Sequence, residues 1–538
     1  MTTNFQNVKV SIALILSHRL PYERAAFEKG LNAALGQDHP SVEVLVVDSR
    51  GPSATLVVDP AGGGDADRLR HLPGTFANRA AMYNVALRAA TGDYFLAIFN
   101  GEKPVLLRQT AVQTLVMAAA RYEKVGMVYA DYERIDPAGG RKDIHLLDWH
   151  PGRLRDTTDF GSAVLLSTAV LRELGGFNEK YQAADLYDLR LRVTEKYEAV
   201  HIANRYGGAL YSVAAPAKTH NVFDYLLADR AAQLEMEHAL TEHLKRTGAY
   251  LAPGTHVQPV AYDADELRRF KDCVASVVIP VNHRPQFIGR AIESVWRQTV
   301  REVEIIVVVN GGHDDPTANA VRRYMPSGDL YDPNTPPVRL IIVDVNNIGL
   351  CLNAGISAAK GKYYVQLDSD DRFKPEAVEK LVKVFDSDPA IGMVIGSYEV
   401  ATLNEATGEI VPNPEIPVVT HEEWTPDNGR NNLLRVNGAG APRSAHVKVI
   451  REVGWFGVND GPSCRNYGED YDLVLRISER YTIGRVWEPI YEVIRHSGGT
   501  DHRIDQATVD RNDNAKDHMR LAALRRRKRL NHGAASDD

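Results

Sequence analysis

The sequence predicts an α/β fold built as two tandem domains, each with a mostly parallel central sheet flanked by helices. Runs of apolar, β-branched residues alternate with stretches of helical period, as expected for strands that are buried on both faces. The order of these runs occurs twice along the chain. With 44% hydrophobic and 25% charged residues among 538, the composition is that of an ordinary globular protein with sizeable cores.

The internal repeat extends over most of the chain. Each copy opens with a strand, a polar turn containing Arg and Pro, a helix, and a second strand that ends in a polar turn with Gly. These openings cover residues 8–51 in the first copy and 273–315 in the second. Two later pairs of segments also match, namely 79–104 with 350–375 and 185–202 with 469–486. Two copies of one ancestral unit explain this order better than chance.

The repeat predicts four segments. They are a first α/β domain over residues 1–215, a helical linker over 216–272, a second α/β domain over 273–505, and a basic C-terminal helix and tail over 506–538.

Two long helices are expected outside the sheets. Apolar residues recur at helical spacing from Tyr225 to Thr247, and Gly248 follows as a C-terminal cap. A comparable helix runs from about Asp510 to Leu530. The segment Leu403 to Asn432 is long for a structureless connection, so we expect it to form a flap over a site.

Charge and cysteine content exclude several classes of protein. The net charge of −7 and a pI of about 6.2 argue against a global nucleic-acid binder. Three separated cysteines without a CxxC pair argue against disulfides and zinc, and favour a reducing, cytoplasmic compartment. No apolar run approaches ~18 residues, and the N-terminal apolar run is expected to be a strand rather than a signal peptide.

One strongly basic stretch lies near the end of the chain. It is either a solvated helix face or a surface weakly attracted to anionic membranes or to a polyanionic acceptor. Its residues are Arg520, Arg525, Arg526, Arg527, Lys528 and Arg529.

Two acidic clusters in the second copy carry the chemistry. Asp368, Asp370 and Asp371 follow a predicted strand, Tyr363 to Leu367, where carboxylates can hold Mg²⁺ or Mn²⁺. An Asx turn with a helix N-cap also favours Asp at such positions. Glu469 and Asp470 begin a predicted helix, as candidates for a general base or as acids that complement the helix dipole.

The ordered motifs resemble the family 2 glycosyltransferases of the GT-A fold. They are SVVIPVNHRPQFIGRAIESVWRQTVREVEIIVVVNGG, then NNIGLCLNAGISAAKGKYYVQLDSDD, then EDYDLVLRI. The resemblance covers about 230 residues and implies a Rossmann-like nucleotide-diphospho-sugar transferase fold. It implies an inverting transfer from a nucleotide-diphosphate sugar, with UDP favoured and GDP or dTDP as alternatives. The acceptor would be a hydroxyl of a saccharide or a lipid-linked molecule, and peripheral membrane contact is the alternative to a purely cytoplasmic location.

By this resemblance, each site residue has an expected role. Asp370 ligates the divalent metal, Asp368 contacts the metal or the ribose, and Asp470 is the general base with Glu469 as its support or substitute. His496 approaches the metal or the diphosphate, with His502 as the second choice and Arg495 and Arg503 as alternative phosphate contacts. The nucleotide-sugar contacts are Pro280, Val281, Asn282, Asn310, Asn353, Asp368 and Ser369. The family often has an acidic pair where this chain has Asn310 and Gly311, which leaves the nucleobase contact open.

Two further pairs have alternative interpretations. Asn353 and Gly355 either position the donor or are ordinary helix and turn residues. Trp455 and Phe456 are either an acceptor platform or part of a packing turn. A helix N-terminus lowers the pKa of a carboxyl, which would weaken Asp470 as a base unless burial offsets it.

The first copy lacks the chemistry of the second. Phe99 and Gly101 stand at the two metal-binding positions, and only Glu102 remains acidic there. Asp185 and Leu186 replace the acid pair. We therefore expect a GT-A-like domain without transferase activity, which binds acceptor, dimerises or stabilises its partner.

Three other functions remain as alternatives. A two-site polysaccharide polymerase is opposed by the first copy, and a non-catalytic carbohydrate-binding scaffold is opposed by the intact acidic motifs of the second. A nucleotidyltransferase would need a Gly-rich triphosphate loop with a basic residue, and no clear one is present.

Overall fold

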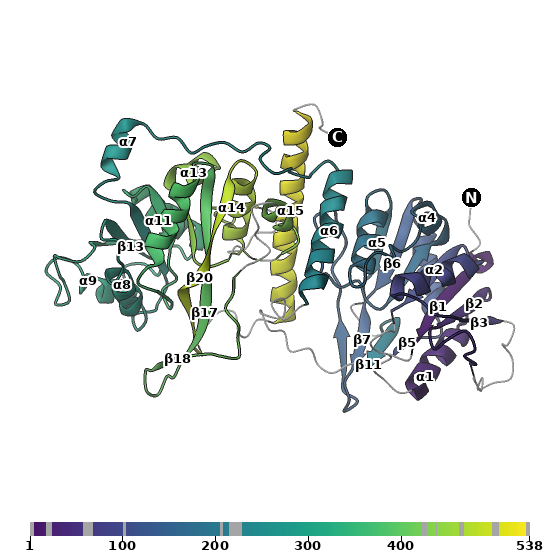
Figure 1. The fold of residues 1–538 in the computed structure, drawn as a ribbon. Coiled ribbons are helices and arrows are strands. Elements are labelled where there is room, and N and C mark those ends of the chain that lie inside the picture. Colours follow the sequence, from purple (N-terminus) through teal and green to yellow (C-terminus); the bar gives the residue numbers. More distant parts are fainter. Residues whose placement is uncertain are drawn as a thin grey trace. The chain divides into compact units, whose positions relative to one another are not determined.

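The computed structural model forms two compact units, Met1–Thr247 and Gly248–Asp538, which Figure 1 shows as ribbons. It describes residues 5–17, 24–56, 68–99, 104–204, 208–214, 229–420, 428–436, 438, 440–461, 467–497 and 505–533.

The N-terminal unit is built on a seven-stranded sheet with the order β10-β6-β9-β4-β1-β2-β3. All neighbours are parallel except β9, which is antiparallel to both β4 and β6. The strands are β1 (Val10–Leu16), β2 (Val42–Asp48), β3 (Leu69–Pro73), β4 (Tyr94–Ile98), β6 (Val125–Ala130), β9 (Ala163–Ser167) and β10 (Glu198–Ile202). A second sheet of four strands has the order β5-β11-β7-β8, from β5 (Val105–Leu107), β7 (Tyr132–Ile135), β8 (Arg141–Ile144) and β11 (Tyr211–Ala214).

Helices cover both faces of the large N-terminal sheet. Residues of α1 and α3 pack on one face, in a core that includes Ile12 and Val44. Residues of α2, α4 and α5 pack on the other face, around Ala13 and Leu45. The helices are α1 (Arg24–Leu35), α2 (Arg79–Ala89), α3 (Ala111–Ala119), α4 (Thr168–Glu173), α5 (Asp185–Thr194) and α6 (Arg230–Arg246), after a short 3-10 turn at Phe5–Asn7. Alternate strand residues thus face opposite helical layers.

The C-terminal unit repeats this topology. Its sheet has the order β14-β13-β12-β15-β19-β17-β20-β16, with β18 paired to β17. Only β19 interrupts the run from β14 to β20, being antiparallel to both β15 and β17, as β9 is in the first unit. The strands are β12 (Ala275–Val281), β13 (Val303–Val309), β14 (Val338–Ile342), β15 (Tyr363–Gln366), β16 (Arg372–Phe373), β17 (Ile391–Leu403), β18 (Ile410–Pro412), β19 (Arg443–His446) and β20 (Thr482–Arg495). The prediction of an α/β fold with mostly parallel sheets is confirmed.

The helices of the C-terminal unit cover both faces of its sheet as well. One core combines alternate residues of β12 and β13 with α8, α9 and α11. The opposite face packs so closely on α10 that a Cβ at Gly355 would lie 2.5 Å from a Val278 methyl group. The helices are α7 (Ala264–Arg269), α8 (Ile288–Trp296), α9 (Pro316–Arg322), α10 (Ile348–Ala358), α11 (Ala377–Ser387), α12 (Gly429–Asn432), α13 (Val447–Glu452), α14 (Glu469–Ser478) and α15 (Gln506–His532).

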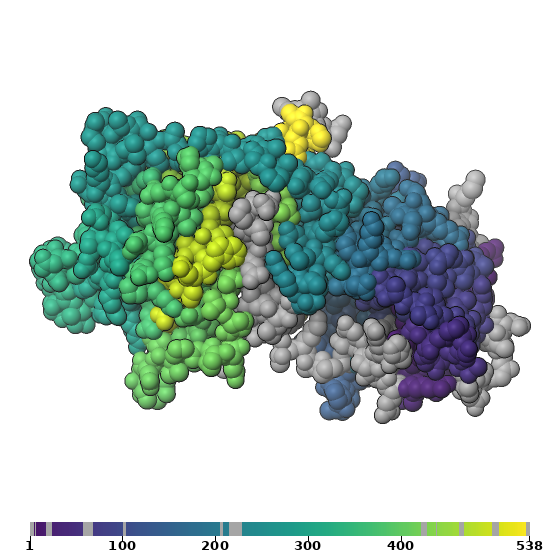
Figure 2. Space-filling view, in the orientation of Figure 1, coloured from purple at the N-terminus to yellow at the C-terminus, as the bar shows by residue number. Residues whose placement is uncertain are grey.

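The expected flap is partly regular structure. β17 continues to Leu403, and the chain then turns back through β18, so the segment opens with a hairpin that projects from the C-terminal unit (Figures 1 and 2). The segment ends in the buried turn of α12. Residues 421–427 lie outside the described part of the chain.

The two long helices form where the periodicity predicted them, as α6 and α15. The interpretation of the basic stretch as a solvated face is wrong for two of its five arginines. Arg520 and Arg527 are fully buried, and Arg526 pairs with Glu479 at 2.8 Å. Only Arg525, Lys528 and Arg529 are exposed. In the part of the chain that the structure describes, no helix combines the length and the apolarity that crossing a bilayer requires.

Candidate active site

The acidic cluster of the second copy follows β15 at the carboxyl edge of the sheet. β15 is parallel to β12, which ends at Val281, and the chain passes from Gln366 through the aspartates into β16. Open α/β sheets bind ligands at this edge. The residues that the sequence singles out after β12, β13 and β15 therefore share one edge of the sheet.

Asp370 is the point where three separate segments meet. Its Oδ2 atom lies 3.0 Å from Nε2 of His496, which follows β20. The same atom accepts a hydrogen bond from Arg284 in the loop between β12 and α8. The His496 ring is almost buried and packs on Phe287, with 4.4 Å between ring centroids. The structure thus brings Asp370 and His496 together and adds Arg284 to them.

This pair of side chains suits a divalent cation that is bound together with a phosphate ligand. Mg²⁺ is commonly held by one or two protein carboxylates plus substrate phosphates and water, and Mn²⁺ also accepts imidazole. Among the described residues, no group of three or more His, Cys, Asp or Glu side chains is arranged to hold a metal ion. The guanidinium of Arg284 already lies against the Asp370 carboxylate, so this position favours positive charge.

Asp368 and Asp371 are held mainly by the protein. Oδ1 of Asp368 accepts a hydrogen bond from Gln366 at 3.0 Å, and its backbone N–H donates to the Tyr491 hydroxyl at 3.1 Å. Oδ1 of Asp371 accepts from the backbone of Ile494 at 2.8 Å. Burial raises the pKa of Asp368 and raises the pKa of Asp371 well above its ordinary value. Ser369, which follows Asp368, is also buried. The metal-binding role of Asp368 stays a prediction.

The residues expected around the nucleobase lie together where β12 and β13 end. Pro280 and Val281 pair with the last residues of β13, and the backbone N–H of Asn310 donates to Val281 at 3.0 Å. The Asn310 side chain is 6% exposed and donates to Asn346 at 3.2 Å, while its Oδ1 has no hydrogen-bond partner among the described residues. A buried acceptor of this kind is costly unless a ligand satisfies it.

Sequence reasoning missed the residues that shape the next turn. His283 has a positive φ of 49°, and its backbone N–H donates to the buried Asp315 at 2.8 Å. The imidazole lies beside Asn282, with 3.2 Å between Nδ1 and Oδ1. Burial opposes ionisation of Asp315, but its hydrogen bonds from Thr317 and His283 lower its pKa overall. The N-cap pattern Asp-Pro-Thr at the start of α9 was the signal that could have identified Asp315.

Asn353 and its neighbours have structural roles. The amide of Asn353 donates to the backbone carbonyl of Phe456 at 2.9 Å and accepts from its N–H at 3.0 Å, which joins α10 to the turn after α13. Phe456 is buried. These contacts favour the packing interpretation of Asn353, Gly355 and Phe456. Arg495 ends β20, whereas His502 and Arg503 lie outside the described residues.

The acid pair begins α14, preceded by Gly468 at a φ of 81°. Asp470 is bound through both oxygens, since Oδ1 accepts from the Tyr471 backbone at 2.7 Å and Oδ2 lies 3.0 Å from the Arg443 guanidinium. Burial, and then the charge of Asp470, raises the pKa of Glu469 to about 7. Burial therefore outweighs the lowering that a helix N-terminus exerts on that carboxyl.

The two acidic clusters share one cation. Arg443 pairs with Asp470 directly, and its charge also lowers the pKa values of Asp368 and Glu469 against the effect of burial. In turn, the charge of Asp470 helps to raise the pKa of Asp368. The aspartates after β15 and the start of α14 therefore lie on the same side of the unit, within one electrostatic network.

The N-terminal unit has different contacts at the equivalent positions. Phe99 packs edge-on against Tyr83, with 5.5 Å between ring centroids, while Gly101 and Glu102 lie outside the described residues. Asp185, at the start of α5, is fully buried and bound by Arg79 through two hydrogen bonds of 3.0 and 2.5 Å. Its neighbour Leu186 packs against the core.

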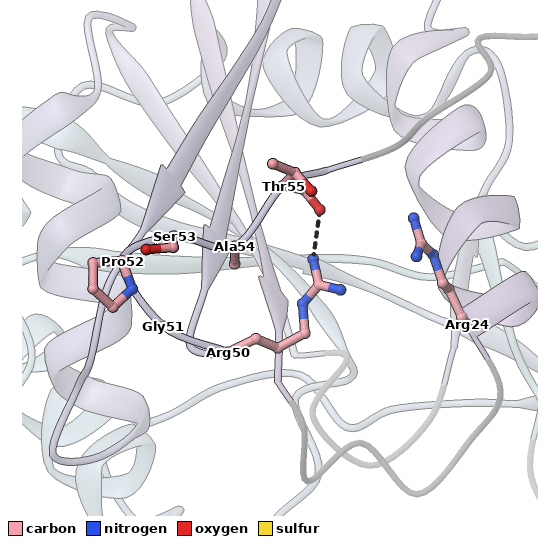
Figure 3. Close-up of a pocket in the computed structure, with 7 residues that line it drawn as sticks. All are labelled: Arg24, Arg50, Gly51, Pro52, Ser53, Ala54 and Thr55. Carbon is pink, nitrogen blue, oxygen red and sulfur yellow. Dashed lines mark hydrogen bonds between the residues drawn. The ribbon is translucent and has the colours of Figure 1, made fainter.

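A pocket of about 580 Å³ opens beside the ends of α1 and β2 in this unit (Figure 3). Arg50 in this pocket binds Asp48 through Nε and Nη2, at 2.9 and 2.7 Å, and donates to the Thr55 carbonyl at 3.1 Å. The second arginine of the pocket, Arg24, pairs with Glu28 at 3.0 Å. The pocket therefore differs in kind from the acidic site of the C-terminal unit.

Comparison with known proteins points to one family. Residues 276–441 match the profile described as Glycosyl transferase family 2. An uncharacterized glycosyltransferase of Rickettsia felis (strain ATCC VR-1525 / URRWXCal2) is 23% identical over 529 residues, which are 92% of this chain and 81% of that protein. The chondroitin synthase of Pasteurella multocida (strain Pm70) is 28% identical over 228 residues, 42% of this chain and 21% of the synthase.

Solved structures resemble the chain only distantly. S. aureus TarS 1-349 in complex with UDP-GlcNAc has 16% identity and a TM-score of 0.34, covering 47% of this chain and 72% of that one. The mannosyltransferase PcManGT from Pyrobaculum calidifontis, in complex with GDP-Man and Mn²⁺, has 15% identity and a TM-score of 0.32 over 57% and 86% of the two chains.

Proposed function

We propose that the C-terminal unit, in which residues 276–441 match the family 2 glycosyl transferase profile, transfers a sugar from a nucleotide-diphosphate donor to an acceptor hydroxyl. We take a UDP-sugar as the donor, a saccharide or a lipid-linked molecule as the acceptor, and direct displacement with inversion as the course. The observation that carries this proposal is the contact of Asp370 with His496 at the carboxyl edge of the sheet.

The nucleotide end of the donor would lie where β12 and β13 end. The buried Oδ1 of Asn310, which has no hydrogen-bond partner among the described residues, can accept a hydrogen bond, and the N3–H of uracil is a donor that fits it. The strained turn at His283, anchored by Asp315, holds the backbone beside this position. These contacts support a UDP-sugar, although a guanine N1–H has the same donor chemistry.

The diphosphate would lie beside Asp370. Asp370 and His496 are the residues that would hold Mn²⁺ or Mg²⁺, with Asp368 as a further candidate ligand. When bound, the cation would stabilise the negative charge that develops on the departing diphosphate. Arg284 lies at the same carboxylate and can donate to phosphate oxygens through its planar guanidinium.

The acid pair of α14, Glu469 and Asp470, would activate the acceptor hydroxyl. A hydroxyl group is a weak nucleophile, so a carboxylate that takes its proton during the attack accelerates the reaction. The carboxyls of Glu469 and Asp470 belong to the same electrostatic network as the aspartates after β15. The acceptor oxygen forms the new bond to the anomeric carbon, and the diphosphate leaves with the electron pair of the broken bond.

We propose that the N-terminal unit does not transfer sugars. Its helix-start acid, Asp185, is bound by Arg79, and Phe99 replaces one strand-end carboxylate. The retained strand order suits a role in acceptor binding or in stabilising the C-terminal unit. A second polymerase site is not part of the proposal.

The biological setting that we propose is polysaccharide or glycoconjugate synthesis. One relative is a chondroitin synthase, and the shared segment spans 21% of it. The specific polymer of that enzyme is therefore not carried over to this chain.

The test is a screen of nucleotide sugars for metal-dependent donor hydrolysis and transfer by the full chain. We expect one donor, a UDP-sugar, to be consumed in the presence of Mn²⁺ or Mg²⁺. Asp370→Asn should abolish turnover and weaken Mn²⁺-dependent binding of UDP measured by calorimetry. The control is Asp388→Asn, at an exposed carboxylate after α11 that accepts a backbone hydrogen bond from Ala390.

The proposal fails if no nucleotide sugar is hydrolysed or transferred. It also fails if Asp370→Asn retains near-normal turnover. A double variant, Glu469→Gln with Asp470→Asn, should retain UDP binding and lose transfer.

A further inference from the structure

The two acids at the start of α14 differ in their surroundings, and Arg443 is the cause. Arg443 is the first residue of β19, which lies between β15 and β17 in the sheet. Its side chain is 19% exposed, and its guanidinium lies 3.0 Å from Oδ2 of Asp470. The buried Nε has no hydrogen-bond partner among the described residues. Arg443 therefore contacts Asp470, the candidate base, although it has no part in the proposed transfer.

Asp470 is already engaged on both sides. Oδ1 accepts from the Tyr471 backbone at 2.7 Å, and Oδ2 is held by the Arg443 ion pair. Two of the roughly four lone-pair sites of this carboxylate are thus occupied by donors of the protein itself. Asp470 is therefore suited to holding Arg443 rather than to accepting a proton from a substrate.

Glu469 is in the opposite situation. No described residue forms an ion pair with its carboxylate. Burial and then the negative charge of Asp470 raise the pKa of Glu469 to about 7, while Arg443 and Lys516 of α15 act in the lowering direction. Burial raises the pKa of Tyr364 in β15, and the negative charge of Glu469 adds to this effect. A group that titrates near neutral pH can both accept and release a proton efficiently there.

We propose that Arg443 is a positioning residue that divides the acid pair, because it binds Asp470 and leaves Glu469 to take the proton of the acceptor hydroxyl. This inference rests on the proposed function and refines its base. The proton moves from the acceptor O–H to the Glu469 carboxylate. The acceptor oxygen bonds to the anomeric carbon, and the bond from that carbon to the diphosphate breaks with its electrons on the diphosphate.

The inference reverses the roles that the sequence resemblance implies, in which Asp470 is the base. The two assignments predict different results for isosteric amide variants. If Glu469 is the base, Glu469→Gln should lower kcat/KM for transfer roughly 10²–10⁴-fold, whereas Asp470→Asn should lower it less than about 10-fold. UDP binding measured by calorimetry should be unchanged in both variants.

The pH dependence of kcat/KM provides the second readout. The acidic limb should lie near pH 7 in the wild type, the value set by Glu469. Asp470→Asn removes a negative charge and should move this limb to lower pH by about 0.5–1 unit. Arg443→Gln removes a positive charge and should move it to higher pH by a similar amount, while Arg443→Lys, which keeps the charge, should restore it.

A readout without substrate separates this inference from the proposed function. The melting temperature of the full chain should fall with rising pH between about 5 and 8, and Glu469→Gln should reduce that fall. If the wild type transfers no sugar but Glu469→Gln has this effect, the proposed function fails and the division of the pair stands. If Asp470→Asn is as inactive as Glu469→Gln, or if Glu469→Gln leaves the melting profile unchanged, the inference is wrong.

Discussion

Arg520 provides the sharpest stability prediction. It lies in the middle of α15 and is completely buried, with hydrogen bonds to Asp517 at 2.6 Å and to the Val436 carbonyl at 2.7 Å. Its guanidinium stacks 4.9 Å above the ring of Tyr471, which follows the acid pair. Asp517 is itself fully buried. Replacing the arginine therefore removes a cation that lies beside a buried carboxylate.

The expected cost follows from this burial. Removing one partner of a buried ion pair costs about 3–5 kcal/mol, because the other charge stays in a poorly solvated environment. We therefore expect Arg520→Met to lower the free energy of unfolding of the C-terminal unit by about 3–5 kcal/mol. The double variant Arg520→Met with Asp517→Asn should recover at least about half of this, since the buried negative charge is removed as well.

Urea unfolding followed by tryptophan fluorescence measures this effect. Four of the five tryptophans lie in residues 248–538, so the signal reports mainly on the C-terminal unit. Arg525→Met is the matched control, because Arg525 lies on the exposed face of the same helix and should cost less than about 0.5 kcal/mol. A cost below about 1 kcal/mol for Arg520→Met, or no recovery in the double variant, would refute the reasoning.

Three further predictions test other parts of the molecule. Because burial raises the pKa of Glu469 from 4.5 to about 7, this carboxyl should make folding stability fall as pH rises across that window, by on the order of 3 kcal/mol. Glu469→Gln should reduce the fall in urea titrations at several pH values. Gly349→Ala should destabilise the unit by about 1–3 kcal/mol in the same assay, because the new Cβ would lie 1.9 Å from the Gly457 carbonyl oxygen. Gly457→Ala is the control and should cost less, because its new Cβ would lie 3.6 Å from Asp460. Equal costs for the two variants would contradict this prediction. Asp370→Asn in the full chain should leave no measurable metal-dependent donor hydrolysis, and hydrolysis near the wild-type rate would contradict the assignment of the site.

Local pattern was enough to predict the fold class. The runs that became β1, β2, β12 and β13 are seven-residue segments with at most two polar residues each, and each is buried throughout or nearly so. Their order repeats, and the two sheets share one strand order from β3 to β10 and from β14 to β20. Burial on both faces leaves a direct trace in composition, which is why the parallel core was predictable.

The positions of the acids could be predicted for the same reason. A carboxylate that follows a buried strand or starts a helix has a local signature, as Asp370 and Glu469 do. Which cations contact those carboxylates depends on the order of the strands in the sheet. Arg443 reaches Asp470 because β19 is inserted antiparallel between β15 and β17, and nothing in its local sequence marks that neighbour.

The sequence by itself therefore determined the two α/β units, the acidic strand end and the acidic helix start, because these follow from short-range periodicity. Only the tertiary structure decided which cations face those acids, since Arg284 and Arg443 reach Asp370 and Asp470 across 86 and 27 residues of chain. The pairing of Arg520 with Asp517, three residues away, could not be predicted either, because a basic run has the same pattern whether its helix face lies in water or against a buried carboxylate. Burial, which shifts the pKa values of charged groups and thereby their reactivity, depends on packing between distant segments.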